Sequence, residues 1–323
     1  MKKYILILSI ASLLLSCGNN KDVFTLKGEF DGLDAGQFII FSYSPKWNKC
    51  DTITINNGKF EYFSELSDTL LLTLQYPNFM QTTIIGMPGI LKLKGKSNEL
   101  LTLQISGDHL NEELSQWRKD NALKKDSATI LAANYIKKHP DSWVSIALFH
   151  DYFVMATKQN QKEAKNLLLK MIKSQPKNTQ LKHWERNLIP FYNIAEGNTL
   201  PMFSLKTLRG KNITNKDFKG KELLINIWST WSYDLKGLTP KLKDFKKENP
   251  NLEIISISLD VDTSAVRRIM EQDSVPGYMC CDQKAWHSPL VKVFGIKSLP
   301  MVIYVNKQGK IEKNTKYEIN LNK

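Results

Sequence analysis

The sequence predicts an α/β protein in which a small antiparallel β domain and a helical segment precede a C-terminal α/β domain. Residues 23–105 alternate apolar and polar side chains as strands do, whereas residues 111–196 follow the period of helices. Beyond Pro201, strand-like runs alternate with helix-like stretches, which is typical of a sheet with helices on both faces. The 323 residues suit two or three domains. The predicted boundaries are 17–108, 109–196 and 197–323.

The first 16 residues are predicted to be a signal peptide. MKKYILILSIASLLLSC begins with two lysines, and its apolar run is too short to span a bilayer. A cysteine directly after Leu15-Ser16 resembles the lipobox of bacterial lipoproteins. That resemblance implies cleavage before Cys17 and its acylation, including by palmitate, and acyl chains hold a protein on a membrane. In lipoproteins, residues such as Gly18-Asn19 after the cysteine favour location in the outer membrane. The alternative is an ordinary secretory signal with a chance cysteine.

The composition is that of a globular protein, with 42% hydrophobic residues. The net charge of +13 comes mostly from scattered lysines, and we interpret it as a solvated surface. Such a charge also suits anionic membranes or acidic partners. No zinc-finger spacing or other nucleic-acid motif is present in the sequence, so no nucleic-acid partner is predicted.

The cysteines and histidines do not form a metal-binding pattern. Cys50, Cys280 and Cys281 remain besides the acylated cysteine, and no pair has metal-ligand or C-x-x-C spacing. The five histidines are scattered singly along the chain. We therefore predict no metal and no cofactor.

The N-terminal strands are separated by turn residues. Asn57-Gly58 supplies the positive φ angles of a type I′ hairpin turn, and the sheet is expected to form a sandwich. Proline and capping residues at 140–142 are expected to start a new helix, and no charged or catalytic cluster is expected inside the helical segment. The predicted strands are 24–30, 36–43, 51–55, 59–63, 69–76 and 100–106, and the predicted helices are 111–139, 143–156, 161–173 and 179–194.

The C-terminal domain is predicted to end in a hairpin around Gln308-Gly309. After it comes NTKYEINLNK, which has no obvious amphipathic helix to cover the sheet. Either the helical middle segment covers that face, or the domain is incomplete and less stable. The predicted strands are 203–205, 222–228, 252–259, 301–306 and 310–313, and the predicted helices are 235–248, 265–272 and 288–294.

Three segments of this domain resemble the thioredoxin fold, and the membrane-anchored thiol–disulfide oxidoreductases of the TlpA/ResA type in particular. They are LLINIWSTWS at 223–232, ISISLD at 255–260 and FGIKSLPMVIYVNKQGKI at 294–311. Upstream, DTITINNGKFEYF resembles the small β domain of unknown function that precedes thioredoxin domains in many bacterial lipoproteins. The resemblance spans nearly the whole mature chain.

The resemblance also shows what this chain lacks. In the family a C-x-x-C pair lies where the strand meets the helix, and the helix dipole lowers the pKa of the first thiol. The matching positions here are Ser232 and Leu235, which have no sulfur to exchange. Ser232 is expected to cap the helix. As a nucleophile it would need a base, for which His287 is the only local candidate.

The family also implies a peptide-facing surface. A cis proline faces the active-site helix, and the matching residue here is Pro300, preceded by Leu299, whose backbone would pair with an extended peptide. Trp228 is expected in the core, with Trp231 and Tyr233 in the contact surface. Asn226 stands where some thioredoxins have a buried carboxylate, and an amide there cannot carry protons.

The adjacent thiols of Cys280 and Cys281 are the remaining redox candidates. Neighbouring Cα atoms lie about 3.8 Å apart, whereas disulfides usually need about 4.4 Å or more. A disulfide between them would be strained and easily reduced, which suits a redox switch. The alternative is two semi-buried thiols in an edge segment. Cys50 is expected to pack in or beside the N-terminal sheet.

Three functions remain open at this point. The first is a lipid-anchored, periplasmic and redox-inactive binding protein for an extended peptide or another envelope protein. The second is a thiol–disulfide oxidoreductase of envelope redox homeostasis that uses Cys280 and Cys281. The third is ligand binding by the N-terminal β domain, although nothing in its sequence names a ligand.

Overall fold

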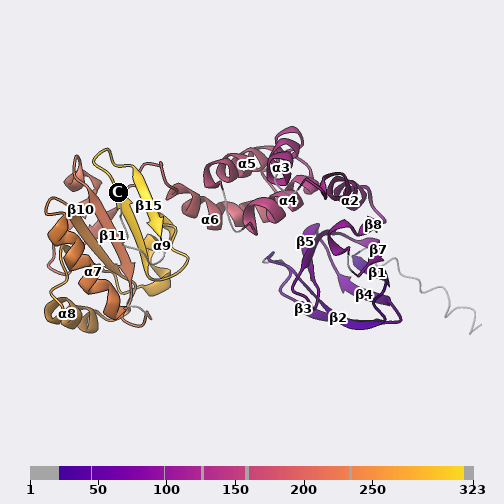
Figure 1. Cartoon of the computed structure of the whole chain (residues 1–323), viewed down its shortest axis with the longest axis horizontal. Coiled ribbons are helices and arrows are strands. Elements are labelled where there is room, and N and C mark those ends of the chain that lie inside the picture. Colours follow the sequence, from indigo (N-terminus) through magenta and orange to yellow (C-terminus); the bar gives the residue numbers. More distant parts are fainter. Residues whose placement is uncertain are drawn as a thin grey trace, which may run out of the picture. The chain divides into compact units, whose positions relative to one another are not determined.

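The computed structural model describes residues 22–44, 46–97, 99–124, 127–156, 160–232 and 235–315. The chain divides into two compact units, one ending at residue 158 and the other beginning at residue 159 (Figure 1). This division falls inside the predicted helical segment, so its helices belong to two units. The predicted acylation site Cys17 and the predicted contact residue Tyr233 lie outside the described residues.

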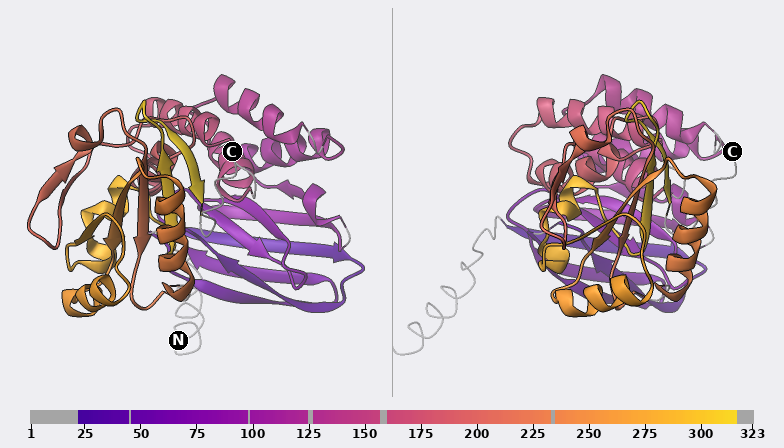
Figure 2. Two further views of the ribbon diagram at one scale, coloured as in Figure 1. Left: turned by 60° about the vertical axis from the view of Figure 1, so that its left-hand side comes forward. Right: turned by 90° about the vertical axis from the view of Figure 1, so that its left-hand side faces the viewer.

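The first unit contains an eight-stranded sheet in the order β6-β5-β2-β3-β4-β1-β7-β8 (Figure 2). All neighbours are antiparallel except β1 and β7, which are parallel. The predicted sandwich is thus a single sheet, whose alternating buried side chains form one apolar core. Its strands are β1 (Val23–Asp31), β2 (Ala35–Phe41), β3 (Cys50–Asn56), β4 (Lys59–Glu65), β5 (Leu70–Gln75), β6 (Gln81–Gly86), β7 (Gly89–Lys96) and β8 (Gln104–Ser106).

The turn between β3 and β4 is the predicted one. Asn57 and Gly58 both have positive φ angles, of 49° and 73°. A type I′ turn requires this at both central residues, and its twist matches that of the strands it joins. The predicted strand at 100–106 is instead a 3-10 helix, η2 (Leu100–Thr102), followed by the short β8.

In the described part of the first unit, four more helical elements follow η2: α2 (His109–Asn121), α3 (Ala128–Lys138), α4 (Trp143–Phe149) and the π-helix η3 (His150–Val154). As predicted, Ser142 caps α4 by accepting a hydrogen bond from the Val144 N–H. The buried side chain of Asn111 bonds both the N–H and the C=O of Ile85 on the edge strand β6. An edge strand has unpaired backbone groups, and here an amide of α2 satisfies them.

The second unit contains a five-stranded sheet in the order β13-β12-β11-β14-β15. Strands β11, β12 and β13 are parallel, and β14 and β15 are antiparallel additions. These strands are β11 (Leu223–Trp228), β12 (Glu253–Ser258), β13 (Tyr278–Cys281), β14 (Met301–Val305) and β15 (Ile311–Thr315). The other elements are α5 (Gln161–Ser174), α6 (Thr179–Asn193), β9 (Ser204–Lys206), β10 (Asn212–Thr214), η4 (Asn215–Phe218), α7 (Leu235–Glu248), α8 (Thr263–Gln272), η5 (Ala285–His287) and α9 (Pro289–Val293).

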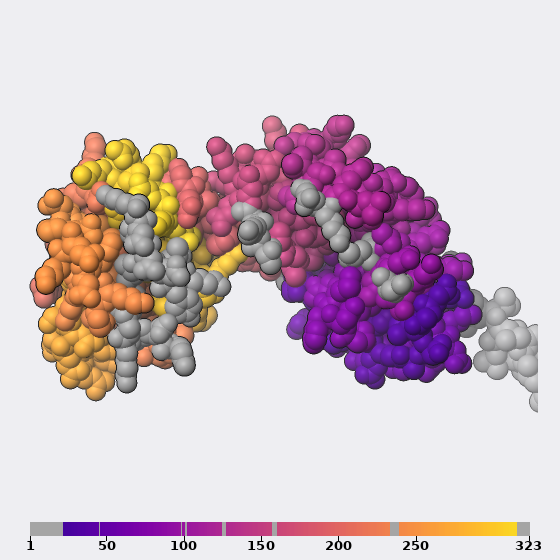
Figure 3. All heavy atoms as spheres, in the orientation of Figure 1, coloured from indigo at the N-terminus to yellow at the C-terminus, as the bar shows by residue number. Residues whose placement is uncertain are grey.

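Both faces of this sheet are covered, which explains its continuously apolar strands. Leu242 of α7 and Val266 of α8 pack on one face, and the outer side of α7 lies on the molecular surface (orange in Figure 3). Leu290 and the β9–β10 hairpin pack on the other face, together with Phe191 and Ile194 from the end of α6. The helical middle segment therefore does help to cover the sheet. The predicted fold class, an α/β domain after an antiparallel-rich β region and helices, is confirmed.

Candidate functional site

The candidate site begins where β11 ends. All six residues of β11 are buried, and Trp228 is only 2% exposed, as predicted for a core residue. The chain then leaves the core abruptly. Ser229 is fully buried, whereas Trp231, two residues later, is 57% exposed. The junction therefore presents an indole on the surface next to a rigid buried strand.

A buried carboxylate holds this junction in place. The backbone N–H and the hydroxyl of Thr230 donate hydrogen bonds to the Asp260 carboxylate at 3.0 and 2.6 Å. Ser258 donates to the same carboxylate at 2.5 Å. Asp260 is 5% exposed. Hydrogen bonds to a charged acceptor are stronger than neutral ones, so this link fixes the turn.

Sequence reasoning did not assign a role to Asp260. The residue closes the ISISLD segment just beyond β12, and the ends of adjacent parallel strands meet at one edge of a sheet. The position of Asp260 just beyond β12 could therefore have indicated that its side chain lies near the end of β11.

The Ser232 hydroxyl turns back to the preceding strand. It donates to the Ser229 carbonyl at 2.7 Å and accepts from the Ser229 N–H at 3.4 Å. The helix α7 begins at Leu235, three residues further on, and the described partners of Ser232 lie upstream of it. The described hydrogen bonds of Ser232 therefore do not form the helix cap that was expected. A nucleophilic serine bonds to a base, and this hydroxyl bonds to a carbonyl instead.

Polar atoms are buried around the junction without hydrogen bonds. In the described part of the chain, Asn226 Oδ1, Trp228 Nε1, Ser229 Oγ and Ser256 Oγ have no partner. Asn226 lies opposite Ser256 in the parallel register of β11 and β12. Buried polar groups without partners destabilise a fold. The end of β11 and the facing part of β12 therefore contain polar atoms that no described residue satisfies.

The loop before β14 lies beside the junction. The Leu299–Pro300 peptide bond is cis, as the resemblance implies. Ile227 pairs with Met301, so the antiparallel register of β11 and β14 leads from Trp228 towards Pro300. Pro300 is buried and Leu299 is half-buried. No described residue hydrogen bonds to the main chain of Leu299, which leaves its backbone groups available.

A second tryptophan, which the sequence did not single out, extends this surface. Trp286 in η5 is 44% exposed, and its ring centroid lies 6.5 Å from that of Trp231. Aromatic pairs at this separation attract each other. The two indoles come from segments more than fifty residues apart, so no local pattern could have joined them.

The three cysteines that the structure describes are free thiols in three different surroundings. Cys280 is 2% exposed, and burial together with the neighbouring Cys281 raises its pKa to about 12. Cys281 packs with the cluster on the opposite face of the sheet, and its Sγ donates to the Asp260 carbonyl at 3.4 Å. Adjacent strand residues point to opposite faces, so the two sulfurs face apart. Cys50 is exposed at the start of β3.

Residues 197–314 match the AhpC/TSA family, and residues 24–114 match a domain of unknown function (DUF4369). Over 124 residues the chain is 29% identical to the thiol-disulfide oxidoreductase ResA of Bacillus thuringiensis, covering 38% of this chain and 70% of that one. It is 28% identical over 127 residues to ResA of Bacillus subtilis, covering 38% and 67%.

Among solved structures, a thiol-disulfide oxidoreductase from Bacteroides fragilis is 28% identical, with a TM-score of 0.36, covering 38% of this chain and 94% of that chain. The AhpC/TSA match and the two ResA relatives agree with the resemblance of residues 223–311 to the thioredoxin fold, and the match at 24–114 agrees with the resemblance of the N-terminal strands to a β domain of unknown function. The chain therefore carries an AhpC/TSA family domain after a domain of unknown function, and its C-terminal part is similar to thiol-disulfide oxidoreductases of the ResA type.

Proposed function

We propose that this protein is a redox-inactive binding protein of the cell envelope, anchored through lipid on Cys17. It binds an extended segment of another envelope protein at a contact surface made of Trp231, Trp286 and Leu299. The observation that carries the proposal is the presence of Ser232 and Leu235 at the two dithiol positions of an otherwise intact frame. An alcohol and an alkyl group cannot exchange electrons with a disulfide.

The contact surface has the properties that peptide recognition needs. Trp231 and Trp286 are exposed and near each other, and indoles bury much area at small entropic cost. The main chain of Leu299 offers hydrogen-bonding groups to an extended partner. Because the Thr230–Asp260 hydrogen bonds hold the turn, the surface is formed before a partner arrives.

Binding is tested by placing a photo-crosslinking amino acid at Trp286 and identifying crosslinked envelope proteins in intact cells. The variants Trp231→Ala and Leu299→Asp are expected to remove the specific crosslinks. Phe63→Ala, which changes an aromatic residue of the other unit that is 61% exposed, is the matched control and should leave them. An unchanged crosslink pattern in both test variants would contradict the binding role.

The second candidate function is thiol–disulfide oxidoreductase activity through Cys280 and Cys281. The names of the relatives favour it. The geometry disfavours it, because the pKa of Cys280 is raised to about 12 and the thiolate is the reactive form. The opposite-facing sulfurs would also have to leave their strand positions to bond.

An insulin-reduction assay separates the two candidates. Wild type and the Cys280→Ser, Cys281→Ser double variant should both show background rates. The Ser232→Cys, Leu235→Cys double variant is the positive control, because it restores a dithiol at the family position. Wild-type activity that disappears in the Cys280→Ser, Cys281→Ser variant would establish the oxidoreductase instead.

The lipid anchor is tested separately. Among the residues that the structure describes, no helix is both long and apolar enough to cross a membrane. Cys17→Ser should therefore move the protein from the membrane fraction to the soluble fraction and abolish incorporation of labelled palmitate. Continued membrane association of this variant would count against acylation at Cys17.

A further inference from the structure

The first unit contains a cavity of about 550 Å³ that neither of the two candidate functions just described uses. This volume lies within the range of small-molecule sites, roughly 300–1,000 Å³. The strand β6, the helices α2 and α3, η2 and the π-helix η3 contribute to its walls. The lining residues are Met80, Gln81, Thr82, Thr83, Glu99, Leu100, Thr102, Arg118, Asn121, Ala122, Ala128, His150, Asp151, Tyr152 and Met155.

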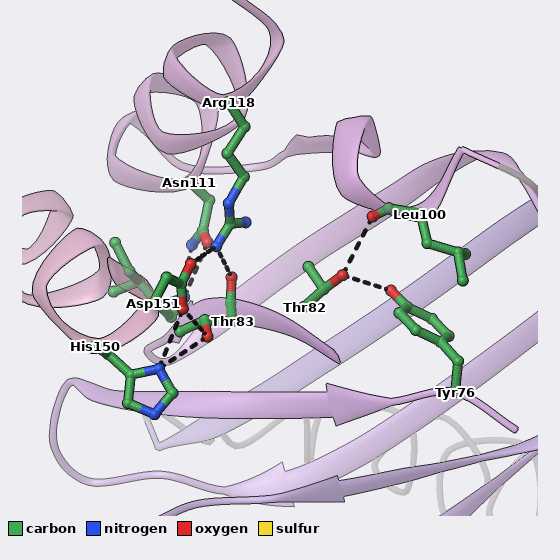
Figure 4. A network of polar contacts seen from close by, with 9 residues as sticks. Tyr76, Thr82, Thr83, Leu100, Asn111, Arg118, His150 and Asp151 are labelled. Atoms are coloured by element: carbon green, nitrogen blue, oxygen red, sulfur yellow. Dashed lines mark hydrogen bonds and ion pairs between the residues drawn. The ribbon is translucent and has the colours of Figure 1, made fainter. Parts of the chain in front are cut away.

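A charged hydrogen-bond network forms one wall (Figure 4). Nη2 of Arg118 donates to Asp151 Oδ2 at 2.8 Å and to the Thr83 carbonyl at 2.9 Å. The other Asp151 oxygen accepts from the Thr83 hydroxyl at 2.6 Å and lies 3.1 Å from His150 Nδ1. The predicted absence of a charged cluster in the helical segment is therefore wrong. The charged residues of this network, Arg118 on α2 and Asp151 on η3, lie more than thirty residues apart in sequence, so no local pattern joins them.

The carboxylate of this network is ionised. Burial raises the pKa of Asp151, but the Arg118 charge, His150 and the Thr83 hydroxyl outweigh it and lower the pKa to about 2. The Arg118–Asp151 pair is therefore neutral overall. A second anion in the cavity would lie near the Asp151 carboxylate and be repelled by it.

Arg118 has donor capacity left over. Its Nη1 is buried and has no hydrogen-bond partner among the described residues. In Figure 4 this nitrogen points away from Asp151, to the side on which Thr82 and Leu100 lie, and both of these residues line the cavity. An unsatisfied donor on a charged group is costly, so an acceptor supplied from the cavity would stabilise the site.

The rest of the wall indicates what accompanies this acceptor. Met80, Leu100 and Met155 contribute apolar lining to the cavity, and methionine side chains adapt to ligands of different shape. His150 and Asp151 also lie on a π-helical turn, and such turns occur frequently at functional sites. Both observations are independent of the unsatisfied arginine.

We propose that this cavity binds an uncharged small molecule with a carbonyl or amide oxygen for Arg118 and an apolar arm for the methionine side chains. The site belongs to the N-terminal unit and does not depend on the peptide-binding proposal. It gives the domain of unknown function, together with α2 and η3, a role as a ligand-binding module.

The test uses the full soluble chain labelled with ¹³C at methionine methyl groups. The probes are the N-acetyl amides of leucine, methionine and phenylalanine, which are uncharged, and the corresponding N-acetyl amino acids, which carry a carboxylate. Saturable shifts of the Met80 and Met155 methyl resonances are expected with the amides, and weaker binding with the carboxylates. Met279 in the other unit is the internal control and should not shift.

Two variants connect the shifts to the proposed contacts. Arg118→Lys keeps a positive charge beside Asp151 but removes the free guanidinium nitrogen, so affinity for the amides should fall about tenfold. Ala122→Leu places a larger apolar side chain in the wall of the cavity, leaves every member of the network in the sequence, and should abolish binding. It also carries the test if Arg118→Lys does not fold.

Four results would overturn the proposal. They are no saturable shift with any amide, carboxylates that bind as tightly as amides, an affinity unchanged in a folded Arg118→Lys variant, or an affinity unchanged in Ala122→Leu.

Discussion

Acid is expected to weaken the first unit through Asp151. Its pKa is lowered from the ordinary 3.8 to about 2 in the folded protein. A carboxylate with a lowered folded-state pKa contributes its stabilisation above the unfolded pKa, and loses it as the pH falls through the folded pKa. At about 1.4 kcal/mol per pKa unit, the contribution at neutral pH is about 2 kcal/mol. It should disappear as the pH falls from about 5 to below 2.

The assay is urea unfolding at a series of pH values, followed by the methyl resonances of Met80 and Met155, which report on the first unit alone. Asp151→Asn should be less stable at pH 7, because Arg118 loses its partner, and its stability should fall less between pH 5 and pH 2. Asp68→Asn, at an exposed ion pair, is the control and should keep the wild-type slope. Equal pH slopes in wild type and Asp151→Asn would refute the reasoning.

Three further predictions concern the second unit. Ser256→Ala should stabilise the second unit by about 1 kcal/mol, because it removes a buried hydroxyl without a partner among the described residues. Ser258→Ala should destabilise the unit, because it removes a donor to the buried Asp260 carboxylate. Chemical unfolding that finds Ser258→Ala the more stable variant would contradict both expectations. Gly295→Ala should lower the free energy of unfolding by more than about 1–2 kcal/mol, because the φ angle of Gly295 is positive and a Cβ would meet the backbone of α6 at 2.7 Å. Gly210→Ala is the control, because it has open space around it and should lose only the energy of backbone strain. Equal thermal shifts in the two variants would count against the packing argument. The Cys280 thiol should react with maleimide only after unfolding, whereas the exposed Cys50 thiol should react at once. Mass spectrometry of pulse-labelled protein measures the order of labelling, and early labelling of Cys280 would contradict the prediction.

Much of the fold could be predicted because it depends on local patterns. The alternation of apolar residues in β3 and β4 and the positive-φ pair Asn57-Gly58 between them specify a hairpin over residues 50–65. The strands β6 and β7 were missed because Pro88 lies between them and a glycine stands at the end of each strand next to it. The short β13 was missed because only four residues define it.

The candidate site was predictable only where the resemblance named a position. Ser232, Trp231 and Pro300 occupy positions of a known motif, so their neighbourhood could be anticipated. Trp286 and Asp260 reach the junction only through the fold of the sheet. Their contacts depend on tertiary packing, which periodicity does not encode.

The hydrogen bonds between Thr230 and Asp260 have a consequence for how the protein responds to its surroundings. They involve oxygen and nitrogen alone, so neither reductants nor oxidants can make or break them. A dithiol site alternates between two covalent states during each catalytic cycle, and the loop that holds it has to accommodate both. Here the hydrogen bonds that hold the turn next to Trp231 do not depend on the covalent state of a dithiol at positions 232 and 235.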